Sequence, residues 1–271
     1  MMKQWKKTLV LGVSVMTAAM VLAGCGGGEQ PKSATGAPQQ KVLKIGTNAT
    51  FVPFEFKNDK TGQHDGFDID MINAIAKKMN AKPEFKDVSF DALIPALFSN
   101  DIDIAVSGMS ITAARAEKVL FSAPYYEAGL GLIVKADSGI SSFDDLNGKS
   151  VAAQMGTTGA DLAEKLPGVT AKQFDHTNEA LLELGNNGVD GAIIDLPVAE
   201  YYVAQHKDAG FKVIPYASET KEYFGMAINK SNTALKEEVD KAIAAMKADG
   251  EFNKIYRKWF DKDMPKDMPA K

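Results

Sequence analysis

The sequence predicts an α/β protein that is built from two units around mostly parallel sheets. Strand-like and helix-like segments alternate from residue 43 to residue 260, which is typical of chains in which helices connect successive strands. Residues 102–106 form a short apolar run, as expected for a buried strand. About 230 residues follow residue 40, and a chain of that length divides more naturally into two units than into one.

The first 40 residues do not share this pattern. Three lysines precede an apolar run over residues 9–23, and small residues stand directly before Cys25, the only cysteine of the chain. A single thiol cannot form an internal disulfide, and a buried structural cysteine is not expected behind such a leader. Residues 1–24 resemble a bacterial lipoprotein signal, which implies a lipid on Cys25 and a protein tethered outside the cytoplasm. Residues 25–40 are rich in small and polar residues, so we expect a flexible tether.

Periodicity predicts the elements of both units. Leu43 and Ile45 alternate with polar neighbours, as in a strand, and Ile72 and Ile75 share one face of a helix that begins near Phe67. The first unit continues with a strand at 84–88, a helix at 91–98, a strand at 102–106 and a helix capped by Thr112. Further strands are expected at 129–134, 150–153, 191–194, 211–214 and 224–228. Further helices are expected from Ala160 and at 178–184, 198–205, 232–248 and 251–260.

Composition excludes several classes of protein. The chain holds 31 basic and 35 acidic residues, and three of the basic ones belong to the leader. An acidic surface argues against binding to nucleic acid, whose affinity depends on neutralised phosphates. After the leader, no run approaches the roughly 20 apolar residues of a membrane span.

Ligands of parallel α/β sheets bind beyond the carboxyl ends of the strands. Four such corners are expected, at 48–51, at 107–110, at 154–159 and at Asp195. The turn at 156–159 presents backbone N–H groups at a helix N-terminus and can bind an anion, but it lacks the sequence of a phosphate loop. An ordinary capped turn would look the same.

Two charged side chains make these corners more specific. Arg115 lies one helical turn beyond Ser110, and a planar guanidinium suits a carboxylate, although a surface ion pair is the alternative. Asp195 ends a buried strand, where a carboxylate is costly without a cation. An arginine and a helix N-terminus for a carboxylate, with an acid for an ammonium, predict recognition of a free α-amino acid.

Five motifs then carry a resemblance to a known family. In sequence order they are TFVPFEF at 50–56, GFDID at 66–70, ALIPAL at 92–97, SITAAR at 110–115 and YRKWF at 256–260. With them, nearly all of residues 41–264 resembles the polar amino-acid family of solute-binding proteins of ABC importers. The resemblance implies two Rossmann-like α/β lobes joined by two hinge strands, the type II periplasmic-binding-protein fold. Lobe 1 would comprise 41–124 and 225–264 and lobe 2 would comprise 130–219, with hinges at about 125–129 and 220–224.

The family pattern assigns the α-groups of the ligand to five residues. Arg115 would bind the α-carboxylate, together with the N–H groups of Ser110 and Thr158. The α-ammonium would go to the Gly108 carbonyl, the Ser110 hydroxyl and Asp195.

The same pattern assigns the ligand side chain. Phe51 and Phe90 would sandwich it, although an aromatic residue in a loop is more often part of a core. Asn48 and Gln154 would discriminate between side chains, and as neutral amides they favour glutamine or another neutral polar amino acid. If Glu55 reached the pocket, it would instead favour arginine, lysine or histidine.

An enzyme is the rival class, because small dehydratases use the same fold. An ammonium on Asp195 would occupy the candidate acid, and the three histidines (His64, His176 and His206) are expected on polar loops or a helix end, remote from the corners. We therefore expect no catalytic residue, no metal and no cofactor. The expected partners are a free L-amino acid, the transmembrane subunits of an ABC permease and, through Cys25, the membrane, but no nucleic acid, and the expected state is a monomer.

Overall fold

The computed structural model describes residues 40–218 and 220–269, so the expected leader, Cys25 and nearly all of the tether lie outside the described residues. Residues 40–271 form one compact unit. No helix in the described part of the chain is long and apolar enough to cross a membrane.

The first lobe is built on a five-stranded sheet of order β5-β1-β6-β15-β7. Its strands are β1 (Lys41–Thr47), β5 (Ala81–Asp87), β6 (Ile104–Ala105), β7 (Val119–Phe121) and β15 (Ala227–Asn229). Its helices are α1 (Phe67–Lys78), α2 (Leu93–Phe98) with the preceding 3-10 turn η1 (Phe90–Ala92), α3 (Ala113–Ala116), α7 (Thr233–Asp249) and α8 (Glu251–Phe260). A small sheet of β2 (Thr50–Phe51), β3 (Glu55–Lys57) and β4 (His64–Asp65) follows β1. Strands β5, β1 and β6 are parallel, whereas β15 is antiparallel to β6 and β7.

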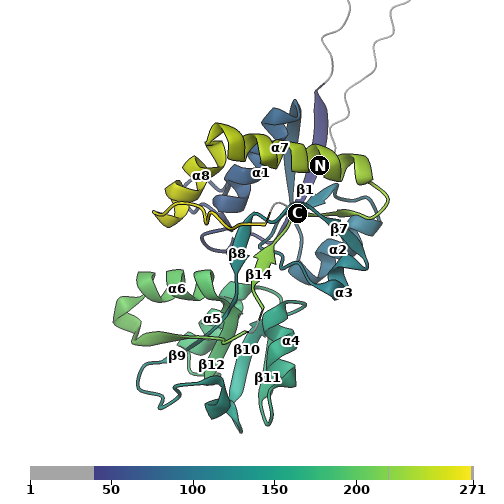
Figure 1. The fold of residues 1–271 in the computed structure, drawn as a ribbon. Helices are drawn as coiled ribbons and strands as arrows, with labels where there is room; N and C mark the ends of the chain where they lie inside the picture. Colours follow the sequence, from purple (N-terminus) through teal and green to yellow (C-terminus); the bar gives the residue numbers. More distant parts are fainter. Residues whose placement is uncertain (1–39, 219, 270–271) are drawn as a thin grey trace, which may run out of the picture. The chain divides into compact units, whose positions relative to one another are not determined.

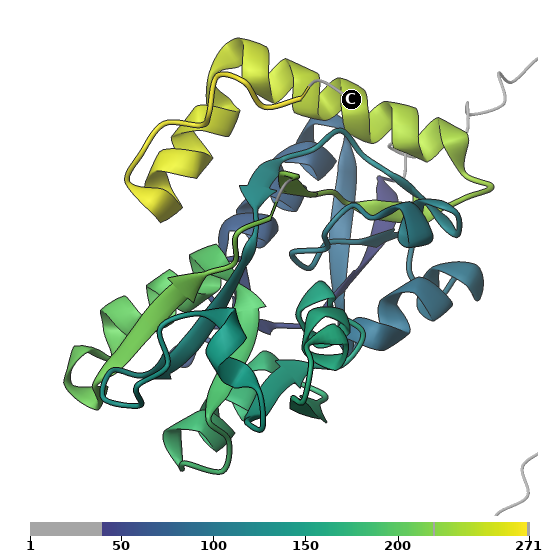
Figure 2. The same ribbon diagram turned by 60° about the horizontal axis from the view of Figure 1, so that its bottom comes forward.

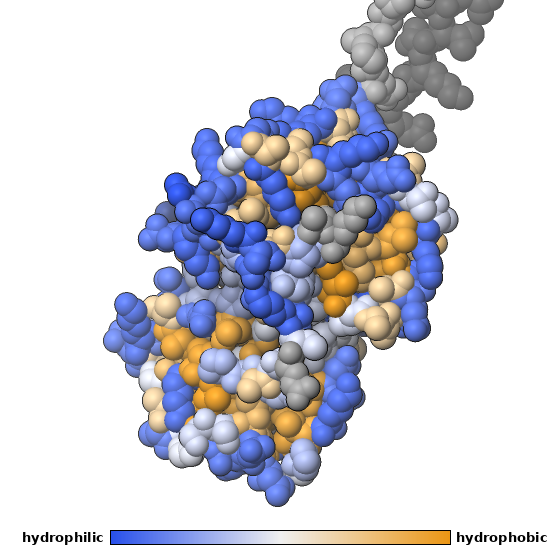
Figure 3. Space-filling view, viewed as in Figure 1, coloured by the Kyte–Doolittle hydropathy of each residue, from blue (hydrophilic) through white to orange (hydrophobic). Residues whose placement is uncertain are grey.

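The second lobe repeats this mixed arrangement with the order β11-β10-β12-β9-β13. Its strands are β9 (Leu130–Lys135), β10 (Ser150–Gln154), β11 (Thr170–Phe174), β12 (Gly191–Asp195) and β13 (Phe211–Pro215). Its helices are α4 (Thr158–Lys165), α5 (Thr177–Gly185) and α6 (Leu196–Gln205), and 3-10 turns are η2 (Phe143–Leu146) and η3 (Lys207–Ala209). Polar side chains cover α7 and α8 of the first lobe, whereas apolar residues gather on the same face of the second lobe (Figure 3).

The chain passes twice between the two sheets. Strand β8 (Tyr126–Ala128) lies between β7 and β9 in the sequence, and β14 (Glu222–Phe224) lies between β13 and β15. The two strands pair antiparallel to each other, and both views show them between the lobes (Figures 1 and 2). The two strands that connect the lobes therefore form a two-stranded sheet of their own.

The prediction of one strand at 224–228 is wrong, because these residues are divided between β14 and β15, which belong to different sheets. The Gly225 N–H donates to the Met109 carbonyl, and a Cβ at Gly225 would lie 2.8 Å from the side chain of Ile111. The chain turns at this tight contact from β14 into β15. Gly225 is the local signal of a break in this run, but the periodicity does not show that the two halves join different sheets.

The edge strand β11 was missed, because its residues are polar and largely exposed. It pairs in parallel with β10 over its whole length. Since β11 ends beside the corner after β10, it brings the following residues to the carboxyl edge of the sheet, and this has consequences for the site.

An aromatic cluster joins the loop after β2 to the paired strands β8 and β14. The Phe54 ring lies 4.8 Å from that of Tyr126 and 5.3 Å from that of Phe224. Phe67 and Phe260 close the cluster from α1 and α8, with ring centroids 5.0 Å apart. Such pairs add about 0.5–1.5 kcal/mol each beyond the burial of their area. The cluster therefore holds the segment before Glu55 in place against the strands that connect the lobes.

Candidate functional site

One cavity lies between the carboxyl edges of the two main sheets. It is lined by Asn48, Phe51, Glu55, Phe90, Ser107, Gly108, Ser110, Arg115, Gln154, Thr157, Thr158 and Asp195. All nine residues that the sequence indicated as ligand-binding are in this lining. Glu55, whose position the sequence left open, lines the cavity too, and Ser107 and Thr157 were not foreseen.

Arg115 is held in the cavity by its own helix and by both lobes. Thr112 caps α3, as expected, and its hydroxyl accepts a hydrogen bond from the Arg115 N–H. The guanidinium donates to the Ser110 carbonyl at 2.7 Å and to the Gly156 carbonyl of the other lobe at 3.0 Å. Its Cζ lies 5.3 Å from the centre of the Phe90 ring. Its guanidinium is largely buried, and its two hydrogen bonds go to backbone carbonyls, so Arg115 is not the surface ion pair that was the alternative.

Asp195 is buried without a hydrogen-bond partner for its Oδ1 among the described residues. It ends β12 and stands at the N-cap of α6. Its pKa is raised to about 8, mainly by burial and also by the charge of Glu222, while the charge of Arg115 opposes the rise. Glu222 was not foreseen: it comes from the connecting strand β14, its carboxylate accepts a hydrogen bond from Ser110, and burial raises its pKa. In the described part of the chain, neither Asp195 nor Glu222 therefore forms an ion pair with a cationic side chain.

The turn before α4 supplies the other polar groups of this part of the cavity. Thr157 caps the helix, because its Oγ1 accepts from the Ala160 N–H at 3.2 Å. A Cβ at Gly159 would lie 2.8 Å from the Ile193 carbonyl oxygen, so only glycine lets the helix pack this closely on β12. The first turn of α4 therefore points its N–H groups towards the cavity.

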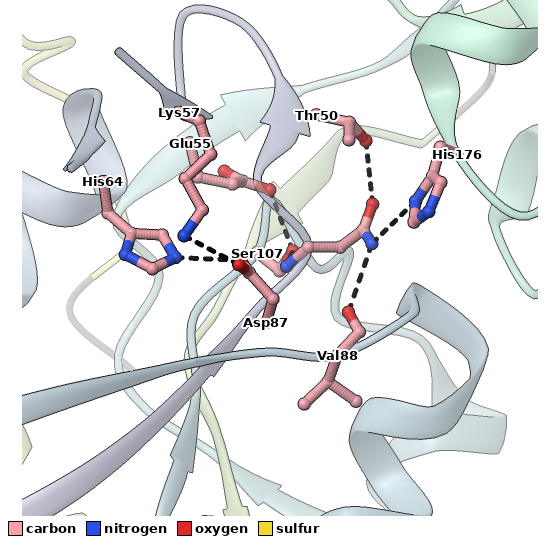
Figure 4. Close-up of polar contacts among 9 residues, drawn as sticks. Thr50, Glu55, Lys57, His64, Asp87, Val88, Ser107 and His176 are labelled. Carbon is pink, nitrogen blue, oxygen red and sulfur yellow. Dashed lines mark hydrogen bonds and ion pairs between the residues drawn. The ribbon is translucent and has the colours of Figure 1, made fainter. Parts of the chain in front are cut away.

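Asn48 and Gln154 bind each other across the two lobes. The Gln154 Nε2 donates to the Asn48 Oδ1 at 2.9 Å and to the Asp175 carbonyl at 2.9 Å. The Asn48 Nδ2 donates to the Val88 carbonyl at 3.2 Å, and its Oδ1 also accepts from the Thr50 hydroxyl at 2.8 Å (Figure 4). The two backbone carbonyls fix which end of each amide is nitrogen.

His176 completes this network, which corrects the expectation that all three histidines are remote from the corners. Its Nδ1 lies 3.1 Å from the Asn48 Nδ2 (Figure 4). Because that nitrogen is a donor, the Nδ1 accepts the hydrogen bond in this arrangement. The missed strand β11 explains the error, since it delivers His176 to the edge of the sheet. His64 pairs with Asp87 and His206 with the Tyr202 carbonyl, and neither lines the cavity.

Glu55 brings a second group of charges to the cavity. Its side chain is fully buried, and its Oε1 accepts from the Ser107 hydroxyl at 2.9 Å. Asp68, on α1, lies close by, and its charge raises the pKa of Glu55, while the Glu55 Oε2 and the Asp68 Oδ1 have no hydrogen-bond donor among the described residues. The Asp68 Oδ2 accepts from the Gly108 N–H at 2.9 Å and from the Tyr125 hydroxyl at 2.8 Å. In the sequence Glu55 lies between two phenylalanines in a short strand, where alternation predicts an exposed polar residue.

Phe51 and Phe90 are both less than one-tenth exposed and form apolar walls of the cavity. The Phe51 ring packs on Gly108, where a Cβ would lie 2.6 Å from its Cε1. Gly108 has a φ of 49°, which also favours glycine. Within residues 40–218 and 220–269, no group of three or more acidic, histidine or cysteine side chains is arranged to hold a metal ion.

Comparison with known proteins places this cavity in context. Residues 43–262 match the model of the bacterial extracellular solute-binding proteins, family 3. The chain is 34% identical to a probable histidine-binding protein of Neisseria gonorrhoeae, over 97% of both chains. It is also 34% identical to ABC transporter arginine-binding protein 1 of Escherichia coli (strain K12), over 83% of this chain and 93% of that protein.

The chain is also similar to solved structures of proteins that bind amino acids. The chain resembles an ancestral arginine-binding protein bound to glutamine with 45% identity and a TM-score of 0.78, over 82% of this chain and 99% of that one. The corresponding structure bound to arginine gives 45% identity and a TM-score of 0.77 over the same shares. The predicted fold class, two α/β lobes of the type II periplasmic-binding-protein kind, is confirmed.

Proposed function

The chain belongs to the bacterial extracellular solute-binding proteins, family 3, and we propose that it captures one free L-amino acid between its lobes for delivery to an ABC permease. The observation that carries the proposal is that Arg115 and Asp195 line the same cavity, and that Asp195 is buried with no hydrogen-bond partner for its Oδ1 among the described residues. A zwitterion satisfies both, since its carboxylate suits the guanidinium and the N-terminus of α4, and its ammonium suits Asp195.

Closing of the lobes is the expected mode of capture. The space enclosed in the cavity is about 10 Å³, roughly that needed by one water molecule. Arg115 and Asn48 both form hydrogen bonds to the opposite lobe. A ligand therefore enters when the lobes are apart, and movement at the paired strands β8 and β14 closes them around it.

The unsatisfied groups of the cavity favour a basic amino acid over the glutamine that the sequence suggested. All four hydrogen-bonding positions of the Asn48 amide are occupied by protein groups. Gln154 retains one lone pair, because both of its N–H groups and one lone pair are in use. Two of the oxygens without partners in the described part of the chain are the Asp195 Oδ1, which suits the α-ammonium of any amino acid, and the Glu55 Oε2. The guanidinium of arginine or the side-chain ammonium of lysine would satisfy Glu55.

Glutamine is the second candidate, because a related ancestral protein with 45% identity has been solved with glutamine bound. A protonated Glu55 carries no charge and would therefore tolerate a neutral amide without demanding a cation. The two candidates therefore differ in the protonation of one carboxyl group.

A thermal-shift screen of the purified protein against the common L-amino acids tests the proposal. We expect arginine and lysine to give the largest shifts, with glutamine next, because a ligand at 100 times its dissociation constant stabilises by about 2.7 kcal/mol. Agmatine, which lacks the α-carboxylate of arginine, is the matched control and should give no shift. Absence of any shift would contradict the proposal, and recovery of a dehydrated ligand by mass spectrometry would favour the enzyme class instead.

We propose further that a lipid on Cys25 anchors the protein, since this is the single cysteine and it follows the lipoprotein-like leader. Cys25→Ser should abolish labelling by radioactive palmitate and release the protein from membranes or leave it unprocessed. Labelling that persists in the variant would rule out this anchor.

A further inference from the structure

Glu55 and Asp68 form a buried acid pair next to the cavity. Both side chains are fully buried and close enough for the charge of Asp68 to raise the pKa of Glu55, and the Glu55 Oε2 and the Asp68 Oδ1 have no donor among the described residues. The groups that face the pair are Ser107, the Gly108 N–H and the Tyr125 hydroxyl, together with the charge of Asp195 from the other lobe. Within residues 40–218 and 220–269, no lysine, arginine or histidine forms a hydrogen bond or ion pair with either carboxyl group.

Two carboxyl groups in contact, without a cation, do not both remain ionised. One proton between them turns repulsion into a hydrogen bond. Burial and the charge of Asp68 raise the pKa of Glu55 well above its ordinary value. Burial also raises the pKa of Asp68, to about 6, while the donors Gly108 and Tyr125 hold it lower. The proton therefore lies on Glu55, and Asp68 accepts it.

The position of Glu55 makes this proton accessible to the ligand. Glu55 lines the cavity, whereas Asp68 lies behind it on α1 and does not. The Glu55 Oε2 has no hydrogen-bond partner outside the pair in the described part of the chain. A guanidinium or ammonium group that reaches this oxygen competes with the proton for the same electron pair.

We propose that Glu55 and Asp68 hold one proton that a basic amino acid displaces and that glutamine leaves in place, so that one cavity accepts ligands of both charges. This inference rests on the proposed function. The displaced proton goes to solvent or buffer, and the cationic group of the ligand takes its place. The total charge of the site is the same before and after the exchange, whereas glutamine leaves the proton between Glu55 and Asp68.

The exchange predicts a pH-dependent selectivity. Each proton released on binding makes an affinity rise about tenfold per pH unit while the free protein still holds that proton. The preference for arginine over glutamine should therefore increase by up to about tenfold per pH unit above neutrality. The α-ammonium is common to both ligands, so any proton lost from Asp195 cancels in this ratio.

Isothermal titration calorimetry of the purified protein at pH 7, in phosphate and in Tris buffer, tests the exchange. The two buffers differ in their enthalpy of protonation, so the difference between their apparent binding enthalpies counts released protons. We expect arginine to release about one proton more than glutamine. Equal proton release by two ligands that both bind would overturn the inference and leave the proposed function intact. If neither ligand binds, the proposed function fails first.

A variant assigns the proton to its residue. In Glu55→Gln the extra proton released by arginine should disappear, while glutamine still binds. Glu238→Gln is the matched control, since Glu238 lies exposed on α7 and forms an ion pair with Lys41 of β1. This variant should behave as the wild type. An extra proton that persists in Glu55→Gln would contradict the assignment. If Glu55→Gln does not fold, the comparison of arginine with glutamine in the wild type decides the matter.

Discussion

Two parts of the cavity handle charge differently. The arginine group consists of Ser110, Arg115 and Asp195, and it contains both signs of charge from both lobes. The glutamate group consists of Glu55 and Asp68, both from the first lobe, and it contains only carboxyl groups. The first is complementary to a zwitterion once the incoming ammonium has displaced the proton of Asp195. The second is balanced by a proton, so it can adapt to the charge of the ligand.

The comparison indicates where general affinity and selectivity are determined. Every free amino acid has an α-carboxylate and an α-ammonium, so the arginine group acts on all of them alike. Only the glutamate group distinguishes a cationic side chain from a neutral one. A variant in the first group should therefore weaken all ligands, and a variant in the second should change their order.

Arg115→Ala should have the largest effect. It removes one charge from a desolvated pair with the ligand carboxylate, which costs about 2–5 kcal/mol of binding free energy for arginine and glutamine alike. Calorimetry measures this, with Arg257→Ala as the control, because Arg257 is exposed and pairs only with Asp263. A variant that still bound amino acids normally would remove Arg115 from the site.

Glu55→Gln should have a smaller and selective effect. Arginine should lose about 1.5–3 kcal/mol, the range for a hydrogen bond to a charged group, while the affinity for glutamine changes little. The ratio of the two dissociation constants is the quantity to measure. Equal losses for both ligands would mean that Glu55 does not contact the side chain.

Asp195 should make the ligand-free protein less stable as the pH rises. Its pKa is about 8 in the folded protein, above that of an unfolded aspartate near 4. Between these values the folded state binds more protons, so stability falls with rising pH by up to about 1.4 kcal/mol per unit. Denaturant unfolding between pH 5 and pH 8 should show a shallower fall for Asp195→Asn. Parallel curves for the variant and the wild type would contradict this reading.

His176→Ala should have the smallest effect. It removes one hydrogen bond of the Asn48 amide in the closed arrangement, and the net contribution of such a bond is about 0.5–1.5 kcal/mol of affinity for both ligands. His206→Ala is the control, because His206 is exposed and does not line the cavity. A change in the order of ligands, rather than a uniform loss, would place His176 at the ligand side chain.

The arginine group could be foreseen because its signals are local. Thr112 caps the helix that carries Arg115, and Asp195 follows a recognisable buried strand, so short motifs locate both at strand ends. The fold class followed from the same alternation of strands and helices. Every residue of the expected site lines the cavity, although its assigned contacts with a ligand remain predictions.

The features of the site that the sequence did not predict depend on contacts between segments that are far apart in the chain. The polar edge strand β11 gave no apolar signal, so the approach of His176 to Asn48, 128 positions away, could not be foreseen. The sequence left open whether Glu55 reaches the pocket, because the aromatic cluster and α1, which bury it near Asp68, come from distant parts of the chain. The expected role of Asn48 as a reader of the side chain assumed free amide groups, and the structure occupies all of them.

Displacement calorimetry tests the central claim most directly. Arginine is titrated at pH 7 into the purified protein that is saturated with glutamine, and the two dissociation constants are compared. The glutamate group predicts that arginine displaces glutamine and binds more tightly. If glutamine binds more tightly than arginine, Asn48 and Gln154 read the side chain, and Glu55 is not the counter-charge of the ligand.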